Sequence, residues 1–271
     1  MVNRRKIPVL ILAGTLLALL VAVPFATAGA AAGVTERAVA KGNGRRLHQP
    51  RMHGTVAIIV DDTAETPDTL SQWQRIHLPL TFAVLPYRAS TRFLAVALHK
   101  DGDAILLHIP TEDTQPFRPP QGHLRRGMTR GAVGRLLDSQ LAQVPYAEGI
   151  NNHRGRIGTK DLRLMMLECQ WAKKKGLYVV DSGDRGSTVA EAAMSLGMEK
   201  RRNEVFLDVK TSRAWIRSKM LELASIANQD GVAIGICHYP RRFTPGEVGL
   251  MMEHLHSEGI DFAFVRDVHE N

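Results

Sequence analysis

Cysteine, aromatic residues and long hydrophobic runs are all scarce in this chain of 271 residues. It contains 2 cysteines and 6% aromatic residues, and its one apolar run of membrane-spanning length lies near the N-terminus. Two cysteines do not make a disulfide framework. Because Cys169 falls in a helical pattern and Cys237 ends an apolar run, two buried free thiols are favoured over a single disulfide. With no cysteine pair at metal-ligand spacing, any metal has to be held by histidines and carboxylates.

The excess of positive charge is confined to the N-terminal end. Lys and Arg number 35 against 27 Asp and Glu, which gives a formal net charge of +8. Residues 1–30 hold three of these eight charges and residues 31–54 hold four, so the chain from Thr55 onward is almost neutral. The best basic run of that part, 173–175, ends a predicted helix and complements its dipole. This distribution argues against a nucleic-acid partner.

Residues 1–30 are typical of an export signal. A basic segment, Asn3–Lys6, precedes an apolar stretch, Ile7–Phe25, and the small residues 26–30 fit a signal-peptidase site. The apolar stretch is longer than most signal sequences, so an uncleaved membrane anchor is the alternative. In both cases the basic segment stays in the cytoplasm. We therefore expect an exported protein of the periplasm or cell envelope, either released or anchored to the inner membrane.

The amino-acid composition divides the chain into three parts. Residues 31–54 are rich in Ala, Gly and Arg and lack apolar periodicity, which predicts a basic flexible linker. Residues 55–271 show no internal repeat and no second domain boundary. The sequence therefore predicts a signal peptide or anchor (1–30), a linker (31–54) and one globular domain (55–271), with membrane contact only through the N-terminal segment.

Short apolar runs alternate with amphipathic stretches throughout the globular part. Such runs, separated by helices, are typical of a parallel sheet covered on both faces. Seven or eight units in one domain favour a barrel over an open sheet. The predicted fold class is α/β, an irregular (β/α) barrel of seven or eight parallel strands. The predicted strands are 56–60, 80–85, 104–107, 177–180, 205–207, 232–237 and 262–265, and the predicted helices are 67–76, 90–99, 129–143, 160–175, 189–196, 212–228 and 245–256.

Two local patterns within the predicted helices lead to further expectations. The sequence Thr244-Pro245-Gly246-Glu247 predicts a capping box at the start of the last helix. The three tryptophans fall in helical patterns and are expected in the core rather than on a sugar-stacking surface. They are Trp73, Trp171 and Trp215.

Polar and ionisable side chains directly follow several predicted strands. The carboxyl ends of parallel strands meet on one rim, where binding and catalytic residues gather. Taken singly, each residue has an ordinary explanation as a helix cap, a loop residue or a hydrogen-bond partner. Two carboxylates and three histidines on one rim together indicate a site. The residues at these strand ends are Asp61, Asp62, His108, Glu112, Asn151, Asn152, His153, Asp181, Ser182, Asp208 and His238.

Such a rim supports metal-assisted hydrolysis. A divalent ion such as Zn²⁺, held by three histidine or carboxylate ligands, keeps one position open for water and lowers its pKa. A neighbouring carboxylate then serves as general base, and a histidine across the site protonates the leaving group. Because neighbouring side chains at a strand end point in different directions, Asp61 and Asp62 suit a division of labour between water and metal.

Read in chain order, these strand ends resemble those of the divergent polysaccharide deacetylase family, distant relatives of chitooligosaccharide and peptidoglycan deacetylases. The resemblance spans about residues 56–268 and implies an irregular (β/α) barrel of the glycoside hydrolase and deacetylase type. It also implies a divalent metal cofactor, with Zn²⁺ as the expected ion. The segments that carry the resemblance are VAIIVDD, LTFAVLP, AILLHIPTE, GINNHRG, LYVVDS, VFLD and GICHYP.

Carried over residue by residue, the resemblance implies that Asp62, His108 and His153 hold the metal. In the related deacetylases both ligand histidines come from one His-x-x-x-His motif, whereas here the second position of the motif is Glu112. Glu112 and His153 are therefore alternatives for the third ligand, and His153 is favoured.

The resemblance also implies the catalytic roles. Asp61 is expected to be the general base and His238 the acid, while Asp181 is expected to orient a partner. The residues expected to contact the substrate or to support the site are Glu112, Asn151, Asn152 and Ser182.

Two functions follow from these residues, and the enzyme is favoured. The first is an exported, metal-dependent hydrolase that deacetylates N- or O-acetylated envelope polysaccharide, at an amide or ester bond, with an envelope glycan or peptidoglycan-like polysaccharide as partner. The second is a catalytically weak or inactive barrel that binds a glycan or another partner in the envelope. The glutamate at position 112 and the scarcity of aromatic residues favour the second.

Overall fold

The computed structural model describes residues 52–66, 68–115 and 122–269, which lie within one compact unit, Gln49–Asn271. The predicted signal or anchor and nearly all of the predicted linker lie outside the described residues. Within the described ranges, no helix is long and apolar enough to cross a membrane.

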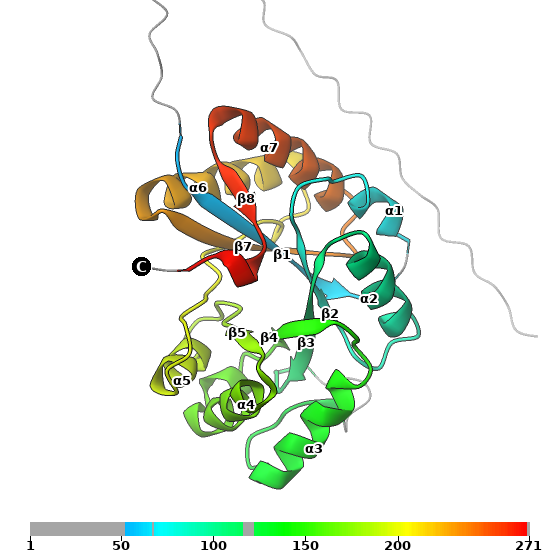
Figure 1. Cartoon of the computed structure of the whole chain (residues 1–271), viewed down its shortest axis with the longest axis vertical. Coiled ribbons are helices and arrows are strands. Elements are labelled where there is room, and N and C mark those ends of the chain that lie inside the picture. Colours follow the sequence, from blue (N-terminus) through cyan, green and yellow to red (C-terminus); the bar gives the residue numbers. More distant parts are fainter. Residues whose placement is uncertain (1–51, 67, 116–121, 270–271) are drawn as a thin grey trace, which may run out of the picture. The chain divides into compact units, whose positions relative to one another are not determined.

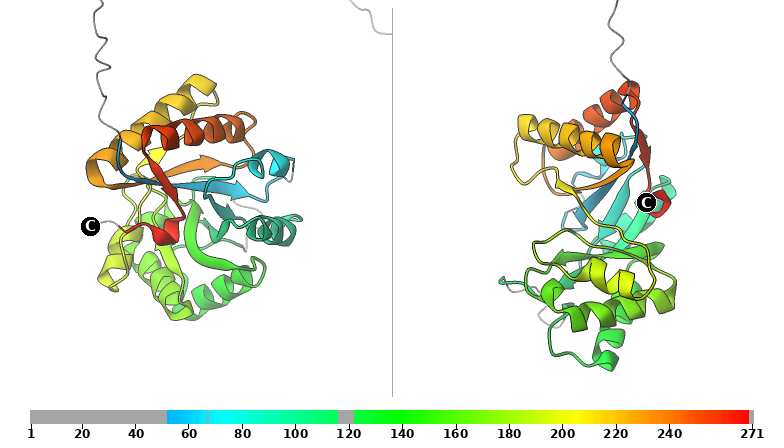
Figure 2. Two further views of the ribbon diagram at one scale, coloured as in Figure 1. Left: turned by 45° about the horizontal axis from the view of Figure 1, so that its top comes forward. Right: turned by 90° about the vertical axis from the view of Figure 1, so that its left-hand side faces the viewer.

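In the described residues, eight parallel strands alternate with helices, which confirms the predicted fold class (Figure 1). The strands are β1 (Thr55–Thr63), β2 (Thr81–Val84), β3 (Ala104–Thr111), β4 (Ala147–Arg154), β5 (Tyr178–Val180), β6 (Val205–Phe206), β7 (Val232–His238) and β8 (Asp261–Ala263). The helices are α1 (Leu70–Trp73), α2 (Thr91–Lys100), α3 (Arg130–Leu141), α4 (Leu162–Lys175), α5 (Val189–Ser195), α6 (Arg213–Asp230) and α7 (Thr244–Glu258). Figure 2 shows the helices arranged around the outside of the sheet.

The barrel is irregular because its two ends are joined weakly. The strands follow the order β5-β4-β3-β2-β1-β7-β6, and β8 pairs with the first residues of β1. In the described part of the chain, the two ends of this order meet at an isolated parallel bridge between Asp181 and Arg202. The backbone N–H of Asp181 donates to the Arg201 carbonyl, and that of Asn203 donates to the Asp181 carbonyl. We call this junction between β5 and β6 the seam.

Alternation along the strands separates two hydrophobic clusters. In β1, Val56, Ile58 and Val60 belong to the large cluster beneath the helices, while Ala57 and Ile59 belong to a smaller one. The smaller cluster fills the barrel interior, since its strand members are the alternate residues. Its members are Ala57, Ile59, Ala83, Leu106, Val180, Ile234, Ile236, Val265 and Val268. One further step of two along β1, β3 and β7 leads to Asp61, His108 and His238, which continue the interior face.

The strand β4 differs most from the sequence prediction. Its first four residues, 147–150, include the charged Glu148 and only Gly149 and Ile150 directly before the polar segment, so no apolar run marked it. This segment forms a strand because its backbone pairs with β3, from Ile105 to Thr111, and with β5. The segment Asn151-Asn152-His153 therefore lies inside a strand, where the backbone is fixed, rather than in a loop after one.

The predicted capping box at 244–247 is wrong. Phe243 precedes α7, and no side chain caps its first turn. Instead the Thr244 hydroxyl donates to Asp208 over 2.9 Å, and the buried Glu247 carboxylate accepts from Arg213 and Arg217 on α6. Tertiary partners thus replace the local cap and fasten α7 to its neighbours. The cysteine prediction is confirmed, because Cys169 and Cys237 are both buried and free.

Candidate metal centre

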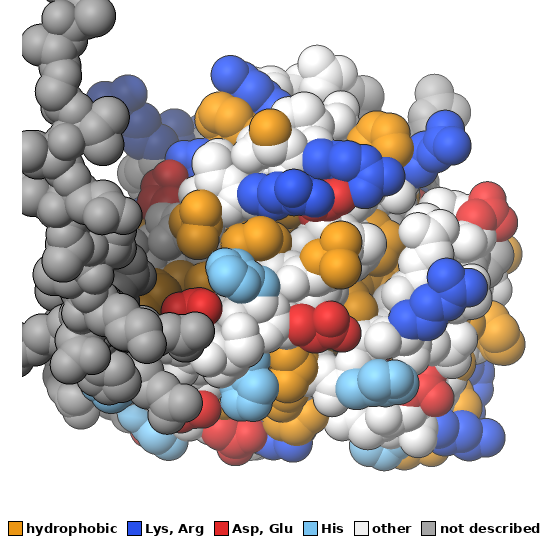
Figure 3. Space-filling model, turned by 90° about the horizontal axis from the view of Figure 1, so that it is seen from above, with side chains coloured by type: hydrophobic (Ala, Val, Ile, Leu, Met, Phe, Trp, Pro, Cys, Tyr) orange, Lys and Arg blue, Asp and Glu red, His pale blue; other side chains and the backbone are white. Residues whose placement is uncertain are grey.

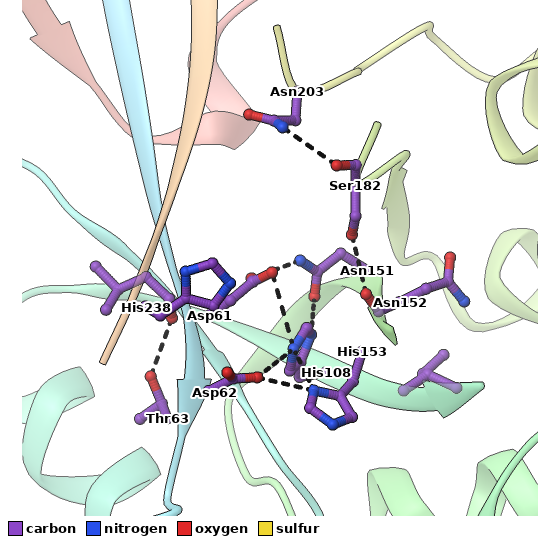
Figure 4. Close-up of polar contacts among 12 residues, drawn as sticks. Asp61, Asp62, Thr63, His108, Asn151, Asn152, His153, Ser182, Asn203 and His238 are labelled. Carbon is purple, nitrogen blue, oxygen red and sulfur yellow. Dashed lines mark hydrogen bonds and ion pairs between the residues drawn. The ribbon is translucent and has the colours of Figure 1, made fainter. Parts of the chain in front are cut away.

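Three predicted ligands meet at the carboxyl ends of β1, β3 and β4 (Figure 4). The Asp62 Oδ1 atom lies 2.8 Å from His153 Nδ1 and 3.3 Å from His108 Nε2. The two imidazole nitrogens are 3.2 Å apart, and all three donor atoms lie within 4.8 Å of one another. His108 and His153 are buried, whereas the Asp62 side chain is 20% exposed. The arrangement forms a compact pocket with one open side.

A backbone irregularity brings Asp62 into this group. Alternation places Asp61 on the interior face, so Asp62 in a regular strand would point toward the helices. Its φ angle is 58°, in the left-handed region, and the register of β1 against β2 shifts between Val60 and Thr63. The irregularity turns the Asp62 carboxylate toward the histidines. Aspartate tolerates this backbone better than most residues.

Asn151 fixes the orientation of His108. Its amide nitrogen donates to Asp61 Oδ1 over 2.7 Å, which leaves its carbonyl oxygen 2.7 Å from His108 Nδ1. His108 Nδ1 therefore carries a proton, and Nε2, the ring nitrogen that would bind a metal ion, faces Asp62 and His153. A ligand histidine is commonly held in this way by a partner on its other ring nitrogen.

The charges at the site favour a cation. Burial raises the pKa of Asp61, against the influence of His108 and His238. Burial also acts to raise the pKa of Asp62, but hydrogen bonds from His108 and His153 outweigh it and hold that pKa well below its usual value. Burial lowers the pKa of His153. The pKa of His108 is raised because the two aspartates outweigh burial, so the site attracts positive charge.

The donor set fits a divalent metal ion. It consists of one carboxylate oxygen and two imidazole nitrogens, which is a common set for an ion that keeps a fourth position open. A tetrahedral ion with bonds of about 2.0–2.1 Å sets its donor atoms roughly 3.3 Å apart. The observed separations of 2.8 to 3.3 Å are close to this value.

His238 lies at the same rim and is held by Asp208. Its Nδ1 atom lies 2.6 Å from Asp208 Oδ1, and its backbone N–H donates to Asp208 Oδ2. Burial alone would lower the pKa of His238, but the contact with Asp208 outweighs it and the pKa is raised. The sequence marked Asp208 as a strand-end residue without giving it a role. The pairing could not be read from the chain because 30 residues separate the partners.

Asp181 and Glu112 lie outside the group of donor atoms. Asp181 accepts from Arg202 over 3.0 Å and from the Gly183 backbone N–H over 2.9 Å, so its partners belong to the seam. The Glu112 carboxylate accepts from the backbone N–H and the guanidinium of Arg126. It is His153, therefore, that stands beside Asp62 and His108.

Asn152 and Ser182 support the strand that carries His153. Alternation turns the Asn152 side chain away from the interior, where its amide nitrogen donates to both oxygens of Glu168 on α4, over 2.9 and 3.2 Å. The Ser182 hydroxyl donates to the Asn152 carbonyl over 3.0 Å. Burial of Glu168 raises its pKa to about 8.

The candidate metal centre opens into a cleft that contains further side chains. Phe206 is partly exposed there, and its ring stacks on His238 with an interplanar angle of 15°. Sequence reasoning missed this aromatic face because Phe206 reads as an ordinary strand residue. The cleft is also lined by Glu65, Asp113, Arg154, Arg156, Asp184 and Arg241.

A family model described as "Divergent polysaccharide deacetylase" matches residues 58–269. Among curated proteins, the chain is 32% identical over 193 residues to the uncharacterized protein YibQ of Escherichia coli (strain K12). That alignment covers 71% of this chain and 60% of YibQ. The match thus spans less than two thirds of this relative's length.

Solved structures share the architecture. The chain aligns with the uncharacterized protein ATU2773 from Agrobacterium tumefaciens C58 at a TM-score of 0.72 and 21% identity, over 80% of this chain and 89% of that one. It aligns with a family 4 carbohydrate esterase from Streptomyces lividans, solved in complex with acetate, at a TM-score of 0.55 and 12% identity. The second alignment covers 81% of this chain and 98% of the esterase. At these identities the likeness shows a shared fold.

Proposed function

The chain belongs to the divergent polysaccharide deacetylase family, and on that premise we propose that it is an exported, metal-dependent hydrolase that removes acetyl groups from N- or O-acetylated envelope polysaccharide. The observation that carries the proposal is the convergence of Asp62, His108 and His153 beside the Asp61 carboxylate, which Asn151 holds, and the His238 imidazole, which Asp208 holds. The resemblance noted at the strand ends is confirmed by the family match.

Asp62, His108 and His153 would hold the ion, which we propose to be Zn²⁺ because its preferred ligands are nitrogen and oxygen donors of this kind. When bound, the ion supplies Lewis-acid activation of a water molecule and of the acyl carbonyl. Asn151 keeps His108 in the tautomer that such a site needs.

Asp61 and His238 supply the proton transfers. Burial raises the pKa of Asp61, which makes its carboxylate a stronger base, and Asn151 holds that carboxylate in place. Asp61 accepts the proton of the attacking water. His238, whose pKa Asp208 raises, gives a proton to the departing amine or alcohol. The Phe206 ring beside His238 offers a face on which a sugar can stack.

Export is part of the proposal and is supported by residues 1–30, with their basic start, their apolar stretch and the small residues that fit a signal-peptidase site. An envelope location would bring the chain to acetylated polysaccharide. The substrate class is supported by the family description.

Metal analysis of the purified full-length chain tests the ligand set. The chain should carry about one zinc ion, and both Asp62→Asn and His153→Ala should lose most of it. Asparagine tolerates the left-handed backbone at position 62, so the first variant removes a charge with little strain. Glu112→Gln is the matched control and should keep its metal, because Glu112 binds Arg126 instead. Unchanged metal in both ligand variants would contradict the assignment.

Acetate release tests the reaction. Acetylated chitooligosaccharide or peptidoglycan fragments should yield acetate with the metal-loaded chain, and release should fall at least 100-fold, by roughly the share of a general base, in Asp61→Asn. A chain that retains the sugar and its metal but frees no acetate would instead be the binding protein described as the second hypothesis.

A further inference from the structure

The loops that follow β6 and β7 expose cations and apolar side chains next to the cleft. Val209 is 60% exposed and Phe243 is 36% exposed, and Lys210 and Arg242 beside them are exposed as well. Figure 3 shows Lys and Arg side chains among hydrophobic ones on the side of the molecule that α6 and α7 form. We call this surface the β6–β7 rim. It consists of Val209, Lys210, Arg213, Trp215, Arg242 and Phe243.

Aromatic rings hold the cations of the rim in place. Lys210 Nζ lies 4.4 Å from the centre of the Trp215 ring, and Lys219 lies over the same ring at 5.0 Å. The Arg213 and Arg242 guanidinium groups lie 4.9 and 5.7 Å from the centre of the Phe243 ring. The prediction that Trp215 belongs to the core is therefore wrong, since it is only half-buried beneath lysines. Such contacts order long side chains at modest cost.

The rim has more positive charge than its acids neutralise. Arg213 pairs with the buried Glu247, and Lys219 pairs with Glu222. Among the described residues, neither Lys210 nor Arg242 has an acidic partner within ion-pair distance. Lys210 and Arg242 are therefore available to pair with negative charges of a ligand.

The rim continues the cleft of the candidate metal centre. Phe206, Asp208 and Val209 are close neighbours in the chain, and so are His238, Arg241 and Arg242. Phe206, His238 and Arg241 line the cleft, and the same two loops go on to form the rim. The same two loops therefore contribute to both the cleft and the rim, so a polysaccharide that extends beyond His238 has the rim next to it. A membrane pressed against the rim would lie beside the mouth through which a polymer must enter.

We infer that the β6–β7 rim binds a glycan segment that carries carboxylate or phosphate groups, next to the acetylated sugar held in the cleft. The inference rests on the proposed function and narrows its substrate to anionic polysaccharide. Lys210 and Arg242 contact the anionic groups, and the exposed faces of Val209 and Phe243 contact the sugar rings.

Two probes of equal length, one anionic and one neutral, test the inference with the full-length chain. Hyaluronan hexasaccharide alternates N-acetylglucosamine with a carboxylate sugar, whereas chitohexaose contains N-acetylglucosamine alone. Hyaluronan should bind about ten-fold more tightly at low salt, as two exposed ion pairs would give, and the preference should fall as salt is raised. The double variant Lys210→Gln/Arg242→Gln should lose the preference. Arg92→Gln/Lys100→Gln, which removes two exposed cations of α2, should keep it.

The outcomes separate this inference from the proposed function. Equal affinity for the two probes, or a preference that survives in the rim variant, overturns the inference. Rim-dependent binding to phosphatidylglycerol vesicles without a hyaluronan preference overturns it in favour of a membrane surface. Acetate release from chitohexaose should be unchanged in the rim variant. If the wild type released no acetate but still preferred hyaluronan, the proposed function would be wrong and the rim would remain a glycan-binding surface.

Discussion

At the scale of single residues, Asp208 controls the protonation of His238. The raised pKa of His238 keeps its ring protonated to higher pH, and a general acid loses activity as pH rises through that pKa. Asp208→Asn removes the carboxylate that raises it. The alkaline limb of the kcat/KM profile for acetate release should therefore move to lower pH. Asp181→Asn, which alters the seam instead, should leave the limb in place, and an equal shift in both variants would refute the pairing.

A second residue-scale effect concerns stability. Glu168 is fully buried with a pKa of about 8, compared with a usual value near 4.5. A raised carboxyl pKa means that stability is fully present below pH 4.5 and is lost as pH rises through 8. Glu168→Gln should remove this loss. At pH 9 its Tm should exceed that of the wild type by several degrees, which corresponds to a gain on the order of 2 kcal/mol in the free energy of unfolding. At pH 5 the two Tm values should differ little.

The fold around Glu168 permits this exchange. The Oδ1 atom of the Asn152 side-chain amide is buried without a hydrogen bond within the described structure, so a turned Asn152 amide could accept from a glutamine. Glu191→Gln on α5 is the control, because Glu191 is exposed and its loss should not change the pH dependence of Tm. If the difference in Tm between the wild type and Glu168→Gln were the same at every pH from 5 to 9, the prediction would be wrong.

At the scale of elements, alternation along the strands explains which parts of the site the sequence could predict. The apolar interior residues Ile59, Leu106 and Ile236 each stand two positions before Asp61, His108 and His238, so a correct strand assignment already aims these side chains inward. The barrel class follows equally from the repeated strand and helix pattern. Only strands with an apolar run carry such a signal, however.

The rest depended on contacts between distant elements. The strand β4 lacks an apolar run and exists through its pairing with β3 and β5. Asp62 enters the site through a left-handed backbone that no periodicity predicts. Thr244 and Glu247 fit a local capping motif, but α6 and Asp208 offer them stronger partners. Local sequence patterns therefore predicted the elements whose position depends on burial of apolar residues. They did not predict the contacts of polar side chains that have several possible hydrogen-bond partners.

At the scale of the whole molecule, a bound ion should tie three strands together. The ligands come from β1, β3 and β4, which are far apart in the chain, so an ion that binds only the folded state stabilises the entire barrel. At a free zinc concentration 100 times Kd the gain is about 2.7 kcal/mol, or roughly 5–10 °C in Tm. Adding zinc after chelator treatment should produce this rise in the wild type and not in Asp62→Asn. An equal rise in both would place the ion elsewhere.

The left-handed backbone at Asp62 also limits how the chain can evolve. Residues other than glycine, asparagine and aspartate adopt this conformation with more strain, so most exchanges at position 62 should cost the barrel stability as well as a metal ligand. Asparagine, one nucleotide away from aspartate, is the exception, since it keeps the backbone and discards the charge. A lineage that no longer needs the chemistry therefore has a short mutational route to an intact, inert barrel.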